Sequence, residues 1–208
     1  MFYKLLLVST YLFAGASPKP VHESAQKILE NMTLTYSQVE YMKSSFNKIS
    51  KSTLLGTKEK MKGKLEYSKG KFRMEMLGKK GSVFIKGEKF FWHISGKEVM
   101  TGNSKKAVPS IFDAIFSDTS IWSKLKTSYV SVPKKKAVIK VDPKGKVPNV
   151  TEMVLEIDLE KRILTKLSYV DDVNNSVEIL FNGTRFFSKG KAHRFTYKIK
   201  KGDKVTRM

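Results

Sequence analysis

The sequence predicts a mainly β, α+β fold in which one strongly curved antiparallel sheet has a few helices against its apolar face. Residues 63–76 alternate apolar and polar side chains on both sides of a tight turn, as the strands of a β-hairpin do. The same alternation recurs in four sets of residues between 137 and 181. Apolar residues at helical spacing occur near the N-terminus and again at about residues 108–127.

The N-terminal residues 1–16 have the composition of a secretory signal peptide. A basic start is followed by a mainly apolar run from Leu5 to Phe13 and by the small residues Ala14-Gly15-Ala16. The run is shorter than the ~20 residues of a membrane-spanning helix. We therefore expect export to the periplasm with cleavage after about Ala16, which leaves residues 17–208 as a single domain. An uncleaved amphipathic N-terminus is the alternative.

An amphipathic helix is expected next, because apolar residues recur every three or four positions from Ala25 to Tyr36. Ser24 or His22 would cap its start, and Glu23 lies where the helix dipole favours a negative charge. The apolar face of this helix must lie on another element.

Strands are expected from residue 39 onward. Residues 39–56 and 58–67 would form the first hairpin, and residues 68–71 a second turn in which Gly70 supplies conformational freedom. Glycines then separate short strands as far as Gly102, which is typical of a meander.

Residues 108–127 interrupt the strands with two short apolar helices. Pro109 lies near the start of the first, and Asp118-Thr119-Ser120 is typical of a break followed by a new cap. Alternating strands then return, with a turn at residues 171–175 before the last long strand.

Residues 63–76, followed by residues 84–93, resemble the signature of the outer-membrane lipoprotein carrier protein family, LolA. The order is a Gly-x-Leu, a basic turn, a Lys-Phe-Arg strand and a hairpin that ends in Trp. The turns read Lys69-Gly70 and Lys86-Gly87 where the family has a basic-Pro and an aspartate-glycine pair. The tail, residues 195–205, is similar to the closing segment of the family, so the resemblance spans nearly the whole mature chain.

The resemblance implies an unclosed β-barrel with the helices as a lid over an apolar cavity. Acyl chains cost ~0.8 kcal/mol per methylene exposed to water, so a lipid anchor needs such a cavity to cross an aqueous compartment. We expect the cavity to be lined by Phe72, Met74, Met76, Phe84, Phe90 and Trp92 from the strands, and by Ile111, Phe112, Phe116 and Trp122 from the lid. For each of them, a sealed core side chain is the alternative.

Lys69 is the candidate latch. The resemblance implies that a basic residue at this position, usually arginine, holds the lid by hydrogen bonds and governs release of the cargo. A lysine keeps the charge but lacks the planar fork of arginine. We expect a looser latch at Lys69 or one carried by another residue, with an ordinary solvated turn lysine as the alternative.

The charge balance favours anionic partners. The chain has 40 Lys and Arg residues against 19 Asp and Glu residues, a formal net charge of +21. Nucleic acid and acidic lipid head groups are the two obvious classes, and a solvated basic surface is the alternative. The chain has no cysteine, which excludes disulfides, thiol chemistry and a lipid anchor on an N-terminal cysteine.

Catalysis is poorly supported. The three histidines, His22, His93 and His193, lack the spacing of a metal site, and no serine stands in a Gly-x-Ser-x-Gly motif. Residues 78–82 lack the spacing of a phosphate loop and are interpreted as a hairpin turn. We expect a protein that is not an enzyme and needs no metal or cofactor.

The resemblance thus implies a monomeric periplasmic carrier. It would take acylated lipoproteins from an inner-membrane ABC transporter to an outer-membrane receptor, with transient membrane-surface contact and without binding nucleic acid. The alternative is a secreted basic protein that binds a polyanion or an anionic lipid surface through its outer face. A lipid-modifying hydrolase is disfavoured because no nucleophile motif is visible.

Overall fold

A computed structural model gives the fold, and it describes residues 23–78, 81–104, 112, 115–116, 119–131, 135–143, 145–147 and 149–208. The expected signal peptide and its cleavage site, and the lid residue Ile111, lie outside these residues. No helix in the described part of the chain is long and apolar enough to cross a membrane.

The N-terminal helix, α1, spans Ala25–Gln38. Ser24 caps it, because its Oγ accepts a hydrogen bond from the backbone N–H of Lys27 at 3.2 Å. Val39 is extended and ends the helix. The buried side of α1 is the apolar face expected from its spacing, with Thr33 as the one polar residue among the buried side chains.

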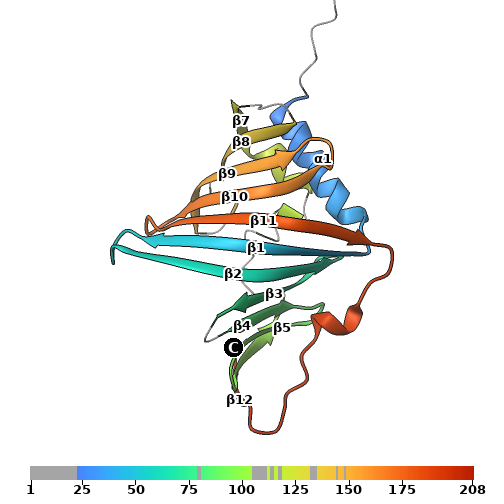
Figure 1. Cartoon of the computed structure of the whole chain (residues 1–208), viewed down its shortest axis with the longest axis vertical. Helices are drawn as coiled ribbons and strands as arrows, with labels where there is room; N and C mark the ends of the chain where they lie inside the picture. Colours follow the sequence, from blue (N-terminus) through green and yellow to red (C-terminus); the bar gives the residue numbers. More distant parts are fainter. Residues whose placement is uncertain are drawn as a thin grey trace, which may run out of the picture.

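Twelve strands form one sheet in the order β12-β6-β5-β4-β3-β2-β1-β11-β10-β9-β8-β7 (Figure 1). Neighbours are antiparallel except for β12 and β6, which are parallel. The strands are β1 Tyr41–Ser52, β2 Thr57–Ser68, β3 Lys71–Leu77, β4 Ser82–Lys86, β5 Phe90–Ser95, β6 Glu98–Asn103, β7 Lys126–Ser131, β8 Lys136–Asp142, β9 Val150–Asp158, β10 Ile163–Asp171, β11 Ser176–Phe187 and β12 Lys204–Arg207. Because β12 and β7 are the two edges, the sheet is curved but not closed, as expected.

Two meanders make up the sheet, and they join where β1 pairs with β11. Strands β1 to β6 follow one another on one side of this seam, and β7 to β11 on the other. Phe46 lies opposite Phe181 in the seam, and both are buried in the main core. The connection from β6 to β7 contains the short 3-10 helix η1, Thr119–Lys124, in place of the second lid helix expected from the sequence.

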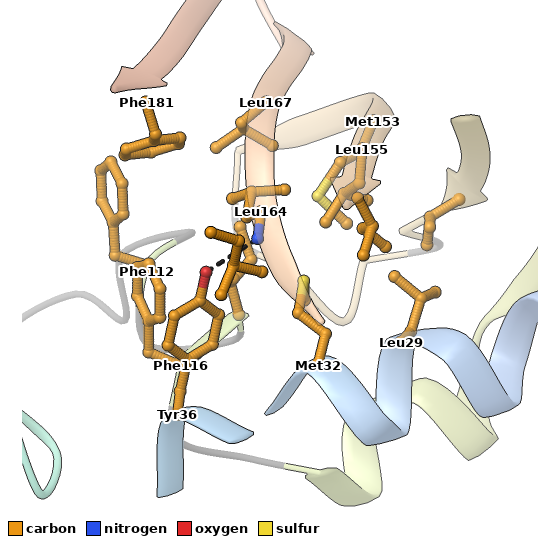
Figure 2. Close-up of a cluster of buried hydrophobic side chains, with 14 of the residues drawn as sticks. Leu29, Met32, Tyr36, Phe112, Phe116, Met153, Leu155, Leu164, Leu167 and Phe181 are labelled. Carbon is orange, nitrogen blue, oxygen red and sulfur yellow. Dashed lines mark hydrogen bonds between the residues drawn. The ribbon is translucent and has the colours of Figure 1, made fainter. Parts of the chain in front are cut away.

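The main core lies between the sheet and α1, on the side that we call the inner face. In Figure 1, α1 crosses the half of the sheet made of β7 to β11. Figure 2 shows Leu29 and Met32 of α1 pointing toward Met153 and Leu155 of β9. Tyr36 completes this contact, because its hydroxyl accepts a hydrogen bond from the backbone N–H of Leu164 at 2.8 Å. That N–H lies at an irregularity of the β9–β10 ladder, where a buried donor needs another partner.

The C-terminal tail covers part of the opposite side of the sheet, the outer face. After β11 the chain forms a second 3-10 helix, η2, Ala192–Phe195, and then returns to pair β12 with β6. Phe195 of η2 is buried with Tyr41 of β1 and Ile85 of β4 in a second, smaller apolar cluster. The tail therefore holds strands of the first meander together from outside.

Candidate functional site

A row of aromatic and methionine side chains follows the inner face of β3, β4 and β5. Phe72 of β3 stacks on Phe84 of β4 with ring centroids 5.5 Å apart, and Phe84 stacks on Phe91 of β5 at 6.1 Å. Met74 lies opposite Phe84 in the ladder, and Met76 continues the row along β3. Phe72 is buried, whereas Met74, Met76 and Phe84 are only half-buried. This row, Phe72, Met74, Met76, Phe84 and Phe91, is called the inner row below.

Two lid phenylalanines extend the inner row toward the core. Phe112 lies 6.3 Å from Phe72 and is nearly parallel to Phe116 at 6.1 Å, with an interplanar angle of 2°. Figure 2 shows Phe112 between Phe181 of β11 and Phe116. The structure thus brings together six of the residues predicted to bind acyl chains: Phe72, Met74, Met76, Phe84, Phe112 and Phe116.

Trp122, the third described lid residue, is fully buried, and its indole N–H forms a hydrogen bond. Its Nε1 donates to Thr33 Oγ1 of α1 at 2.8 Å, and Thr33 Oγ1 donates to the carbonyl of Ile115 at 2.9 Å. Thr33 therefore joins two parts of the lid segment, residues 115–122, to α1. All three residues are buried, so each of these hydrogen bonds is costly to leave unmade.

A third buried hydrogen bond joins the lid segment to the sheet. The Tyr67 hydroxyl, at the end of β2, donates to the carbonyl of Phe116 at 2.9 Å and accepts from the backbone N–H of Gly70 at 3.1 Å. Tyr67 thereby connects the β2–β3 turn with the lid.

Lys69 is in that turn but points elsewhere. Lys69 and Gly70 have φ angles of 46° and 77°, the left-handed pair of a two-residue hairpin turn. Lys69 Nζ lies 2.7 Å from Glu40 Oε1, and both side chains are largely exposed. The contact to the lid that was expected of Lys69 is made here by Tyr67, so a latch role for Lys69 stays a prediction.

Phe90 and Trp92 are on the outer face, apart from the inner row. Alternation along β5 places Phe91 inward and its two neighbours outward, and Phe90 is 51% exposed. Both line a separate hollow of about 530 Å³ with Tyr197, Ile199 and Met208 of the tail. The sequence prediction that grouped Phe90 and Trp92 with Phe72 was therefore wrong about their face.

A charged cluster on the outer face fixes the tail. Arg194 of η2 donates to Glu66 from Nε and from a terminal nitrogen at 2.9 and 3.2 Å, and it also reaches Glu75 at 3.2 Å. Glu75 pairs in addition with Arg73. Burial raises the pKa of Glu66, but the Arg194 hydrogen bonds and charge outweigh burial and hold this pKa below its usual value.

Three site residues escaped sequence reasoning: Thr33, Tyr67 and Phe91. Thr33 could have been recognised from the sequence, because it is a polar residue at an apolar position of an amphipathic helix. Phe91 could have been assigned to the inner face from the alternation of side chains along β5, once the turn between β4 and β5 was known. Among the described residues there is no group of three or more His, Cys, Asp or Glu side chains that could hold a metal ion.

Comparison with known proteins gives one family and a set of similar folds. A family model described as "Outer membrane lipoprotein carrier protein LolA" matches residues 37–198. Comparison with curated protein sequences gives no match.

Two of the similar solved structures cover most of this chain. One is an uncharacterized conserved protein from Thermus thermophilus, with a TM-score of 0.59, 14% identity, and coverage of 89% of this chain and 100% of that one. MucB gives a TM-score of 0.50 at 11% identity, over 84% of this chain and 62% of MucB. At these identities the likeness is one of fold.

Proposed function

Because the chain belongs to the outer membrane lipoprotein carrier family, LolA, we propose that it is a periplasmic carrier for acylated lipoproteins. It takes them from an inner-membrane ABC transporter, binds their acyl chains at the inner row, and passes them to an outer-membrane receptor. The observation that carries this proposal is the half-buried state of Met74, Met76 and Phe84, next to Phe72, whose ring packs against the lid residue Phe112. These side chains offer apolar surface that the protein itself does not fully cover.

The chemistry of the inner row suits acyl chains of varied shape. Each methylene moved from water to an apolar site contributes ~0.8 kcal/mol. Methionine side chains are flexible and polarizable, so Met74 and Met76 can adapt to different chains, while the stacked rings of Phe72 and Phe84 form a firm wall. No covalent step is required.

The lid segment supplies the device for loading and release. Its three buried hydrogen bonds, through Thr33 and Tyr67, are the contacts that an opening motion breaks. Transfer then follows from the difference in affinity of the cargo for transporter, carrier and receptor.

The test is binding of a fluorescent fatty acid to Met74→Glu and to the matched control Phe90→Glu. A carboxylate at residue 74 would be buried against an acyl chain, so we expect about a tenfold or greater loss of affinity. The control adds the same charge on the outer face, and its affinity should equal that of the wild type. Both positions are at least partly exposed, so both variants should fold, which far-UV circular dichroism checks.

Equal affinities for wild type and Met74→Glu would contradict acyl binding at the inner row. Loss of affinity in Phe90→Glu alone would move the site to the outer hollow. Native mass spectrometry of protein purified from a membrane-containing lysate then identifies the lipid or lipoprotein that co-purifies.

A further inference from the structure

The β1–β2 hairpin projects from the body of the molecule. Residues 53–60 are exposed without exception, so both faces of the hairpin are in solvent near its tip. In Figure 1 this tip reaches beyond the neighbouring strands β3 and β4. Two leucines occupy the tip itself: Leu54 is 90% exposed and Leu55 is 72% exposed.

A third exposed apolar side chain lies on the adjacent turn. Val173, between β10 and β11, is 65% exposed. The two turns touch, because Thr53 Oγ1 donates a hydrogen bond to the carbonyl of Asn174. Single exposed apolar residues are ordinary, but several on one projecting tip indicate an interaction surface.

A row of lysines leads away from this tip along β2. Lys58, Lys60, Lys62 and Lys64 are alternate residues of one strand, so they share a face and lie ~7 Å apart. All four are exposed, and among the described residues none forms an ion pair; Glu75, which lies opposite Lys64 in the ladder, pairs with Arg73 and Arg194. Lys51 of β1 lies directly opposite Lys58, although like charges in such a pair destabilise a sheet.

The acidic residues near the tip offset this charge only in part. Glu59 lies on the other face of β2, and Asp172 lies in the neighbouring turn. Glu152 and Glu178 line a hollow with Lys51 and Lys58, but they pair with Lys140 and Lys166. The Asp171 carboxylate is occupied within that turn, where it accepts hydrogen bonds from the backbone N–H groups of Val173 and Asn175.

We propose that this tip docks on the surface of a membrane that contains anionic lipids. Leu54, Leu55 and Val173 enter the interfacial region, and the lysines of β1 and β2 bind the anionic head groups. Apolar insertion and basic charge each give only weak attachment to a membrane, and together they give stable but reversible attachment. A polyanion would use the lysines alone and leave the leucines in water, so the tip favours a lipid surface.

The experiment is flotation of the purified chain with vesicles of phosphatidylcholine alone or of phosphatidylcholine with phosphatidylglycerol. We expect binding only to the anionic vesicles. Leu54→Asn/Leu55→Asn should weaken it about tenfold or more. Lys58→Gln/Lys60→Gln/Lys62→Gln should do the same. The control Lys189→Gln/Lys198→Gln/Lys201→Gln removes the same charge from exposed lysines elsewhere and should bind like the wild type.

A probe at the tip reports insertion directly. Since the chain has no cysteine, Leu55→Cys places a single environment-sensitive fluorophore, and Lys161→Cys provides a labelled control in the distant β9–β10 turn. A blue shift with anionic vesicles is expected at residue 55 and not at residue 161.

Three results would overturn the proposal: no binding to anionic vesicles, equal shifts at both labels, or binding that the lysine variant loses and the leucine variant keeps. The last result would assign the lysines to a polyanion such as polyphosphate. The proposal is independent of acyl binding, because vesicle flotation does not require the inner row. Fatty-acid binding and flotation can therefore fail separately.

Discussion

Gly63 shows how one residue shapes the seam between the two meanders. It lies opposite Phe46 in the β1–β2 ladder, and the Phe46 ring occupies the space above it. A Cβ at residue 63 would lie 2.1 Å from Phe46 Cζ and 2.5 Å from the carbonyl oxygen of Glu75. Only glycine lets the ring cross the strand there, which gives a physical reason for the Gly-x-Leu motif in this chain.

Gly63→Ala should therefore destabilise the protein. Because the backbone of Glu75 must move as well as a side chain, we expect a loss of about 1–3 kcal/mol in the free energy of unfolding. Gly78→Ala is the control, since a Cβ there meets nothing within 4 Å and should leave stability unchanged. Urea unfolding of the two variants measures the difference, and equal midpoints would contradict it.

Tyr67 is the residue that we expect to govern lid opening. Tyr67→Phe removes the donor to the Phe116 carbonyl and the acceptor of the Gly70 N–H. Leaving such buried groups unpaired costs about 1–3 kcal/mol. The variant should lose stability by that amount and release a bound fluorescent fatty acid faster in stopped flow.

Tyr169→Phe is the matched control for Tyr67→Phe. Its hydroxyl has no hydrogen-bond partner among the described residues, so stability and release rate should stay close to the wild type. Equal release rates for Tyr67→Phe and the wild type would show that the Tyr67 hydroxyl does not hold the lid.

At the scale of elements, the position of the C-terminal tail depends on the guanidinium of Arg194. Arg194 is the bridge between η2 and two strands, and its partners are 128 and 119 residues away in the sequence. Glu66 has a pKa below its usual value in the folded chain, so its contribution is present at neutral pH. That contribution is lost as the pH falls through the folded-state pKa.

Arg194→Gln should lower the free energy of unfolding by about 1.5–3 kcal/mol at neutral pH, because Glu66 keeps its burial and loses its charged donors. The gap to the wild type should narrow as the pH falls below the lowered pKa of Glu66, where this carboxyl is protonated in both proteins. Lys135→Gln, which breaks the exposed pair with Glu160, should have almost no effect. A gap that is constant with pH would contradict the assignment to Glu66.

The elements differ in how far the sequence could predict them. Helix α1 and the strands of each meander follow from local periodicity, which packing reinforces. The second lid helix became the 3-10 helix η1, since local spacing alone does not distinguish a short α-helix from a 3-10 helix. Phe90 and Trp92 were placed on the wrong face because one residue of error in a turn reverses the parity of a strand.

At the scale of the whole molecule, the contacts that could not be predicted are those between residues far apart in the sequence. The β1–β11 seam, the parallel β6–β12 pair and the Arg194 cluster all join residues far apart in sequence. The general architecture could be predicted because a curved sheet with one apolar face requires a cover. The hydrogen bonds that Thr33 and Tyr67 make to the lid could not be predicted, because they depend on where the helices lie over the sheet.

The open edges of the sheet also bear on the size of the space that the sheet can enclose. In a closed barrel, the number of strands and their stagger fix the diameter. Here β7 and β12 are edges, so no ladder of backbone hydrogen bonds fixes the distance between the two ends of the sheet. The proposed acyl-chain site therefore lies on a sheet whose curvature is not fixed by ring closure.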